Sequence, residues 1–372
     1  MKSKVYFFDL RAKKRNESLS AKVGRIFDSA GFSRIISEND MVALKLHFGE
    51  KGNNAFINPI FVRQVVDRVK KCGGKPFLTD TNTLYKGSRS NAIDHVVTAI
   101  ENGFAYAVVN APVIIADGLV SKDSVEVEIN KKHFDKVKIA SAIYYSNAMI
   151  VLSHFKGHEM AGFGGAIKNL AMGCAPASGK QRQHSTLKPR VAENCRACLA
   201  CIKNCPRDAI TLVDGKAYID AEKCIGCGEC ISMCVFNVIK PVWKTDINEF
   251  VERMVEYAYG AYINKKEKTA FINFVMNVTP LCDCTPWSDA PIVHDIGILA
   301  SFDPVALDKA CFDLVNSQNG NPHSALGDKN SGFKAGEDKF RAIHPETRGE
   351  YQLEYAEKLG MGTRDYELVR LM

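Results

Sequence analysis

The stretch that decides the architecture of this chain is CRACLACIKNCP (195–206), together with CIGCGECISMCV (224–235). Each run spaces four cysteines as C-x2-C-x2-C-x3-C, and the pattern that starts at position 195 starts again 29 residues later, at position 224. An apolar pair follows each run, at 209–210 and at 238–239. Between the runs, Asp214-Gly215 is a strong signal for a hairpin turn. The repeat predicts two similar halves with short strands, related by a pseudo-two-fold axis.

These cysteines indicate metal rather than disulfides, because they are dense within a large chain of 372 residues. The two runs resemble the bacterial two-cluster ferredoxin motif, in which the fourth cysteine of each run ligates the other cluster. The resemblance implies two 4Fe–4S clusters. The first would be held by Cys195, Cys198, Cys201 and Cys234, and the second by Cys224, Cys227, Cys230 and Cys205.

Structural zinc and disulfides are the alternatives for these cysteines. Zinc sites, however, use two ligand pairs with a spacer rather than runs of four. Val235 stands where the ferredoxin motif has proline, which departs from the motif without removing a ligand. Because a cysteine occupies every ligand position, we expect electron transfer rather than substrate binding at iron.

Outside the two runs, short apolar segments rich in Val, Ile and Leu alternate with segments of helical period. This alternation predicts an α/β fold with a mainly parallel sheet. Strands are expected at 4–8, 42–46, 76–79, 107–109, 125–129, 149–152, 269–278 and 295–301. Helices are expected at 18–30, 59–72, 90–101, 165–172, 247–263, 304–315 and 351–359.

The polar stretch GKQRQHSTLKPR (179–190) is expected to be a linker. We therefore predict an α/β host domain made of residues 1–186 and 243–372. A small α+β ferredoxin-like insert at 187–242 would interrupt it. Three serial domains are the alternative, but neither flanking piece has the pattern of a complete domain.

Polar side chains follow several predicted strands, where ligands bind in parallel α/β sheets. They give the candidate catalytic residues His47, Asp80, His154, Lys156, His158 and Lys168. Structural roles are the alternative for the histidines. The glycine-rich stretch 157–165 fits neither a P-loop nor G-x-G-x-x-G. It is suited either to anion binding at a helix N-terminus or to a tight turn that needs glycine.

Cys282 and Cys284 form a C-x-C pair, a spacing too strained for an easy disulfide but suited to thiolates that face a metal. With Cys174 they are candidates for a third metal site, and two unrelated thiols are the alternative. Cys72 and Cys311 lie in apolar helical surroundings and are expected in the core.

Composition narrows the classes of partner. The net charge of +7 comes from 49 basic and 42 acidic residues that are interspersed, so no nucleic-acid partner is expected. No uncharged apolar run reaches ~18 residues, so no membrane span is expected. The first residues, MKSKVYFFDLRAKKR, hold too short an apolar stretch for a signal peptide, which favours a cytoplasmic protein.

The whole chain resembles a widespread prokaryotic family of unknown function, in which an α/β domain is fused to a two-cluster ferredoxin module. The segments that carry the resemblance are SHFKGHEMAGFGGAIKNLAMG (153–173), SFDPVALDKA (301–310) and AIHPETRGEYQLEYAEKLGMGTRDYELV (342–369).

We expect an iron–sulfur electron-transfer protein that supplies a small-molecule redox site in the host domain, as an oxidoreductase of unknown substrate. Its partner would be a redox protein or a small-molecule donor or acceptor. The alternatives are a non-catalytic electron-relay or docking protein, and a protein that handles metal or clusters through Cys282 and Cys284. No Rossmann fingerprint indicates a nicotinamide or flavin cofactor.

Overall fold

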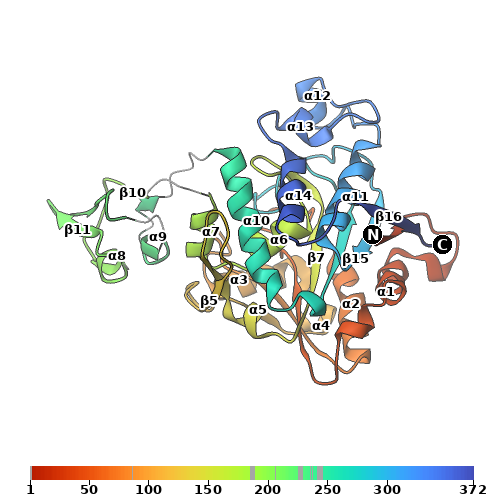
Figure 1. Cartoon of the computed structure of the whole chain (residues 1–372), viewed down its shortest axis with the longest axis horizontal. Coiled ribbons are helices and arrows are strands. Elements are labelled where there is room, and N and C mark those ends of the chain that lie inside the picture. The colour runs from red at the N-terminus through yellow and green to blue at the C-terminus, as the bar shows by residue number, and fades with distance from the viewer. Residues whose placement is uncertain are drawn as a thin grey trace.

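The computed structural model describes residues 2–85, 87–184, 189–205, 207–224, 229–234, 236, 238–240 and 246–372. Its centre is an eight-stranded sheet with the order β16-β1-β15-β14-β7-β2-β3-β4 (Figure 1). The strands are β16 (Tyr366–Arg370), β1 (Ser3–Asp9), β15 (Gly297–Ser301), β14 (Thr269–Val275), β7 (Ala148–His154), β2 (Met41–Lys45), β3 (Lys75–Asp80) and β4 (Val113–Ile115).

Most neighbouring strands of this sheet run parallel, and β15 alone runs against both of its neighbours. The predicted α/β fold with a mainly parallel sheet is therefore confirmed. The carboxyl ends of β2, β3, β7 and β14 meet at one edge, since these four strands are parallel. This edge is where the polar residues that follow the strands come together.

Helices cover both faces of the sheet. Along β2, Val42 and Leu44 belong to a hydrophobic cluster with α1 (Leu19–Ser29) and α2 (Pro59–Lys71), whereas Ala43 belongs to the cluster on the opposite face. Successive strand residues alternate in this way because a strand is pleated. The result is a three-layer α/β/α arrangement.

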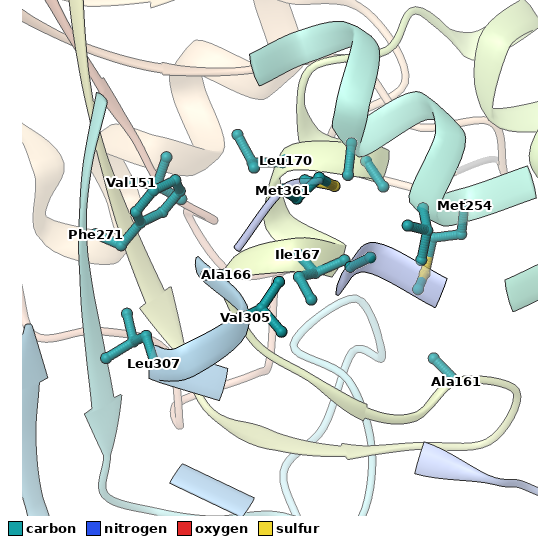
Figure 2. Close-up of a cluster of buried hydrophobic side chains, with 14 of the residues drawn as sticks. Val151, Ala161, Ala166, Ile167, Leu170, Met254, Phe271, Val305, Leu307 and Met361 are labelled. Atoms are coloured by element: carbon teal, nitrogen blue, oxygen red, sulfur yellow. The ribbon is translucent and has the colours of Figure 1, made fainter. Parts of the chain in front are cut away.

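The second cluster packs α6 (Ala166–Gly173), α10 (Ile247–Ile263), α11 (Pro304–Asn316) and α14 (Gly349–Lys358) against the sheet. Figure 2 shows Val151 and Phe271 of the sheet beside Ile167 and Leu170 of α6. These residues are fully buried, so this packing fixes α6 at the end of β7. The structure also has shorter helices: α3 (Ala92–Ala99), α4 (Tyr106–Val109), α5 (Ser141–Tyr145), α12 (Ala325–Lys329) and α13 (Lys339–Ile343).

Two local predictions were wrong. Residues 107–109 belong to helix α4 instead of a strand. Residues 179–184 of the expected linker lie in helix α7 (Ala177–His184), most of which is buried. Of the rest of that linker, 185–188 lie outside the described residues, and Arg190 begins a short strand. The strand expected at 125–129 is confirmed as β5 (Ser124–Glu128), which pairs with β6 (Lys136–Ala140) outside the central sheet.

The cysteine-rich segment, defined here as the described residues between 190 and 240, forms its own small sheets. Strand β10 (Arg190–Val191) pairs with β13 (Ile239–Lys240), and β11 (Ile210–Val213) pairs with β12 (Lys216–Ile219). The predicted hairpin turn is confirmed, because Asp214 and Gly215 both have positive φ, at 48° and 73°. Two single-turn helices, α8 (Ala200–Lys203) and α9 (Glu229–Ser232), complete the segment. Its separation as an insert stays a prediction.

Candidate functional site

A cavity of about 400 Å³ lies at the edge where the parallel strands end. All six residues predicted as catalytic line it: His47, Asp80, His154, Lys156, His158 and Lys168. Both thiols of the C-x-C pair, Cys282 and Cys284, line it too. The structure therefore brings these eight side chains together, although their roles in a reaction stay predictions.

Sequence reasoning missed several lining residues, among them Tyr85, Arg89, Lys180 and His184. Lys45, near the end of the strand predicted at 42–46, and Asn169, next to Lys168, belong to polar stretches that the sequence did indicate, and both line the cavity. Lys180 and His184 lie on α7, which the sequence presented as a linker. No sequence signal singles out Arg89.

Ion pairs organise the wall formed by β2 and β3. The Nζ of Lys45 lies 3.0 Å from Asp80 Oδ1 and donates to Asn169 Oδ1 at 2.6 Å. Arg89 pairs with Glu50 at 3.1 Å and with Asp80 at 3.6 Å. Burial by itself raises the pKa of the Asp80 carboxyl, but Lys45 and the other nearby cations hold it below its ordinary value. Asp80 is therefore an ionised carboxylate whose negative charge is neutralised by Lys45 and Arg89.

His154 uses both of its ring nitrogens for structure. Nδ1 lies 2.8 Å from Asp283 Oδ1, and Nε2 lies 2.9 Å from the carbonyl oxygens of Met276 and Asn277. Carbonyl oxygens only accept, so Nε2 carries a proton. Burial raises the pKa of Asp283, but His154 and then Lys156 outweigh it and keep the carboxylate ionised. Nδ1 therefore donates as well, and His154 positions the loop that carries Asp283.

His47 and His158 share a different arrangement. The Nδ1 of His47 accepts the Gly49 N–H at 2.9 Å, and the Nδ1 of His158 accepts the Ala161 N–H at 3.1 Å. Burial, and then a neighbouring cation, holds the pKa of each imidazole well below its ordinary value. Both rings are therefore neutral with the proton on Nε2, so they are suited to donate hydrogen bonds rather than to act as bases.

The glycine-rich stretch has a structural explanation. A Cβ on Gly157 would meet the Pro280 carbonyl oxygen, where strand β8 (Lys156–His158) crosses the next loop. At the start of α6, Asp308 accepts the N–H groups of Ala166 and Ile167 at 2.8 and 3.0 Å. A side chain of the protein itself therefore occupies the helix N-terminus, so of the two alternatives the structure favours the turn that needs glycine.

Lysine and thiol groups meet on the side of the cavity formed by α6. Lys168 Nζ lies 3.7 Å from Cys282 Sγ. A hydrogen bond from the Cys284 thiol, which outweighs burial and is helped by Lys168, lowers the pKa of Cys282 well below its ordinary value. The same bond, together with burial, raises the pKa of Cys284. The pair therefore shares one proton, with Cys282 as the thiolate.

Cys174 does not join this pair. It ends α6, is fully buried in the main hydrophobic cluster and does not line the cavity. Across the described ranges, no group of three or more His, Cys, Asp or Glu side chains could hold a single metal ion. The cavity wall thus carries the thiols of Cys282 and Cys284, and Cys174 does not lie there with them.

Cysteines of the cysteine-rich segment line a cavity of their own. A second, small cavity is lined by Cys195, Cys198, Cys201 and Cys234, the set that the ferredoxin resemblance implies for the first cluster. Backbone N–H groups of Ala217 and Val238 donate to the sulfurs of Cys195 and Cys234 at 3.5 and 3.4 Å. The four cysteines of this set therefore line one cavity, and two of them accept backbone N–H groups.

The second set is described in part. Cys205 accepts the Ala209 N–H at 3.3 Å, as Cys234 accepts that of Val238 in the other half. Cys230 lies on α9 and is buried in the core of the cysteine-rich segment. Cys227 lies outside the described residues. None of the cysteines that the structure describes forms a disulfide.

The cysteine-rich segment lies against the cavity wall. Leu84 lines the cavity and also packs on the hydrophobic core of the segment. Helix α9 contacts α7, whose residues Lys180 and His184 line the cavity, and Figure 1 shows the segment beside α7. Lys122 Nζ also donates to Asn204 Oδ1 at 2.6 Å. Leu84 and helix α7 therefore contact the cysteine-rich segment and line the cavity as well.

The family described as "Domain of unknown function (DUF362)" matches residues 42–313 of the chain, which is well over half of its length. The chain belongs to this family. The DUF362 match includes the cavity residues on both sides of the cysteine-rich segment, and membership in the family assigns them no reaction.

Two curated relatives match short parts of this DUF362 protein. The indolepyruvate oxidoreductase subunit IorA of Methanothermobacter thermautotrophicus is 38% identical over 52 residues, which are 14% of the chain and 8% of that protein. One component of the ion-translocating oxidoreductase complex of Methanosarcina acetivorans is 45% identical over 46 residues, 12% of the chain and 17% of that protein. The chain thus spans less than a fifth of either relative.

Two solved structures are similar to the DUF362 chain at low sequence identity. The lactate racemase apoprotein of Thermoanaerobacterium thermosaccharolyticum is 11% identical, with a TM-score of 0.43 over 94% of the chain and 81% of that protein. A protein of Thermotoga maritima is 8% identical, with a TM-score of 0.36 over 92% of the chain and 59% of that protein. Among the described residues, no helix is long and apolar enough to cross a membrane.

Proposed function

We propose that this chain is an iron–sulfur oxidoreductase in which two 4Fe–4S clusters deliver electrons to a small molecule in the host cavity. The host domain would comprise residues 1–186 and 243–372, and the cluster-binding insert residues 187–242. The short matches to proteins named as parts of oxidoreductases agree with an electron-transfer role. The observation that carries the proposal is the double contact of Leu84, which touches both the cavity and the core of the cysteine-rich segment.

The clusters would supply one-electron transfer at potentials set by hydrogen bonds to their sulfurs and by solvent exposure. The residues of the chain provide those hydrogen bonds through the N–H groups of Ala209, Ala217 and Val238. Cys201 and Cys230 are buried, each 7% exposed, whereas Cys198 is exposed and the other described cysteines of the two runs are half-buried. A site with thiolates at every ligand position suits electron transfer more than substrate binding.

The cavity residues suggest an anionic substrate. Five cationic side chains line the cavity, against two carboxylates: Lys45, Arg89, Lys156, Lys168 and Lys180 against Asp80 and Glu159. Several of the cations are paired with carboxylates, whereas the ammonium group of Lys168 lies beside the Cys282 sulfur. The Nε2–H groups of His47 and His158 add neutral donors. Such a wall would bind and orient a small carboxylate or phosphate-bearing molecule.

The proposal is tested on the anaerobically purified full chain. We expect about eight irons and eight sulfides per chain and paramagnetic signals after reduction with dithionite. With [13C-methyl]methionine, reduction should change the relaxation of Met172, which lines the cavity, and leave the terminal, exposed Met372 unaffected. Zinc without sulfide, or equal effects on both methyl groups, would contradict the proposal.

A substitution at the contact separates electron delivery from cluster assembly. Leu84→Asp should leave the iron content unchanged and weaken the effect on Met172, because it places a charge between the cavity and the cysteine core. Val213→Asp is the control, since Val213 is exposed on β11 and lines neither cavity. A non-catalytic relay protein would instead show the Met172 effect but bind no small anion in the cavity.

A further inference from the structure

The C-x-C pair lies in a tight turn that brings its two thiols together. The backbone N–H of Thr285 donates to the Cys282 carbonyl at 3.0 Å, and the Thr285 hydroxyl donates to the same oxygen at 2.9 Å. Asp283 and Cys284 thus occupy the two central positions of a β-turn. The turn shortens the distance between positions 282 and 284 relative to an extended chain. The C-x-C spacing therefore opposes a disulfide between them less than the sequence suggested.

This turn is anchored on three sides. Asp283 is fully buried, and its carboxylate is bound by His154 at 2.8 Å and Lys156 at 3.4 Å. Its backbone carbonyl accepts the Glu50 N–H at 3.1 Å. Asp283 therefore holds the backbone between the two cysteines, while both cysteine side chains line the cavity. Such anchoring presents the sulfurs to a ligand in a fixed geometry.

The charges around the pair favour one thiolate. The ammonium group of Lys168 lies 3.7 Å from Cys282 Sγ. Hydrogen bonding within the pair, as the largest cause, lowers the pKa of Cys282 and raises that of Cys284. A thiolate, and not a thiol, is the nucleophile in exchange reactions. Cys282 is thus suited to act as the nucleophile, and Cys284 keeps a proton that it can donate in a later step.

We propose that Cys282 and Cys284 form a redox-active thiol pair that reduces a small organic disulfide bound in the cavity. Cys282 Sγ attacks one sulfur of the substrate, the substrate S–S bond breaks, and a mixed disulfide forms while the first leaving thiolate takes the proton of Cys284. Cys284 Sγ then attacks Cys282 Sγ, which forms the internal disulfide and releases the second substrate half as a thiolate. The substrate gains two electrons and the pair loses two.

Regeneration of the pair consumes two electrons and one proton, and it returns the thiolate to Cys282 and the thiol to Cys284. This half of the cycle rests on the proposed function, since two one-electron clusters would together supply the two electrons. The first half depends on the thiols alone. The two halves can therefore be tested separately.

The probe for the thiol half is bis(2-hydroxyethyl) disulfide, added to the anaerobically purified full chain and followed by peptide mass spectrometry. In the wild type we expect an internal Cys282–Cys284 disulfide, seen as a peptide that has lost two hydrogens. Cys284→Ser should instead trap a mixed disulfide at Cys282, whereas Cys282→Ser should leave Cys284 unmodified. Cys72→Ser, which changes a cysteine on the other side of the sheet, should behave as wild type.

A charge variant tests the role of Lys168. Lys168→Met should slow the reaction of Cys282 at least about tenfold at pH 6.5 and have a smaller effect at pH 9, because the thiolate fraction then depends less on its cation. A merely structural role of Lys168 would slow the reaction equally at both pH values. Loss of folding would show as a change at Cys72, which serves as an internal reference.

Three results would overturn the inference: no reaction at Cys282, a stable mixed disulfide in the wild type, or equal trapping at both cysteines in the single variants. Iron, sulfide and the paramagnetic signals are measured on the same samples. Intact clusters with inert thiols would refute the thiol pair alone, and thiol exchange in a chain that binds no clusters would refute the proposed function alone.

Discussion

The imidazole of His154, at the end of β7, and the carboxylate of Asp283, in the loop after β14, form a buried pair with 2.8 Å between Nδ1 and Oδ1. The pair joins the ends of two neighbouring parallel strands. The other nitrogen of His154 is bound to backbone carbonyls of the same loop. His154 thus helps to position the loop that carries the two cavity thiols.

Replacement of His154 should therefore lower the stability of the protein and also slow the reaction of the Cys282 thiol. His154→Ala leaves the Asp283 carboxylate buried with only Lys156 beside it, and removal of one partner of a buried pair costs about 3–5 kcal/mol. We expect that loss in the free energy of unfolding, measured by urea titration, and slower modification of Cys282. His294→Ala, at an exposed position, should change neither quantity. Unaltered stability in His154→Ala would show that the pair does not hold the loop.

Buried His95 predicts a pH dependence of stability. Its side chain is fully buried, and within the described residues neither ring nitrogen has a hydrogen-bond partner. Burial, and then Arg89, lowers the pKa of this imidazole to about 3. Between pH 6.5 and about 3 the unfolded chain therefore binds more protons than the folded chain, so this residue makes stability fall as the pH falls through that window.

His95→Leu removes this titration. The difference in unfolding free energy between the variant and wild type should shift by about 2 kcal/mol in favour of the variant when the pH is lowered from 7 to 5. This is because pH 5 lies about 1.5 units below the ordinary pKa of histidine, and each unit corresponds to about 1.4 kcal/mol. Chemical unfolding at the two pH values measures the difference. His294→Leu is the matched control at an exposed position. A constant difference between His95→Leu and wild type across this range would contradict the assignment.

The sequence predicted the parts of this molecule that depend on local pattern. The buried strands β2, β3, β7 and β14 are apolar runs that end in polar residues, so the edge where those residues meet could be inferred. Helix α7 could not, because its burial depends on distant partners. Lys180 donates to the Thr81 hydroxyl and the Asn82 carbonyl at 2.5 and 2.8 Å, and these contacts exist only once the chain has folded.

The start of α6 illustrates the same limit. A glycine-rich stretch before a helix is compatible with an anion site, and the sequence left that choice open. The structure fills the position with Asp308, which lies more than a hundred residues further along the chain. Arg89 is similar, since its partner Glu50 lies in the loop after β2 and its partner Asp80 at the end of β3. Long-range charge pairs of this kind carry no periodic signal in a sequence.

Asp308 therefore offers a prediction about α6. Its carboxylate accepts the N–H groups of Ala166 and Ile167 and the side-chain amide of Asn273, at 2.7 Å for the last. Asp308→Ala leaves three buried donors without this acceptor, which should lower the unfolding free energy by about 3 kcal/mol or more. Since α6 carries Lys168, Cys282 should also react more slowly at pH 6.5. Asp328→Ala, at an exposed carboxylate on α12, is the control; equal stability of the two variants would contradict the prediction.

The exchange of the fourth cysteine between the two clusters gives the sharpest test of the cysteine-rich segment. Cys234 lines the same small cavity as Cys195, Cys198 and Cys201, although it follows the second run in sequence. If it ligates the first cluster, Cys234→Ala should lower the iron content from about eight to about four. The double variant Cys195→Ala/Cys234→Ala should retain about four irons, because both changes remove the same cluster.

The contrasting variant is Cys224→Ala/Cys234→Ala, which should lose nearly all iron, since its two changes fall on different clusters. Iron and sulfide analysis of the purified chains, with the paramagnetic signal of the remaining cluster, measures both outcomes. Clusters built from one run each would reverse the result, with about four irons in Cys224→Ala/Cys234→Ala and almost none in Cys195→Ala/Cys234→Ala. The two pairings thus predict opposite iron contents for the same pair of proteins, and a misfolded segment, which would empty both variants alike, fits neither.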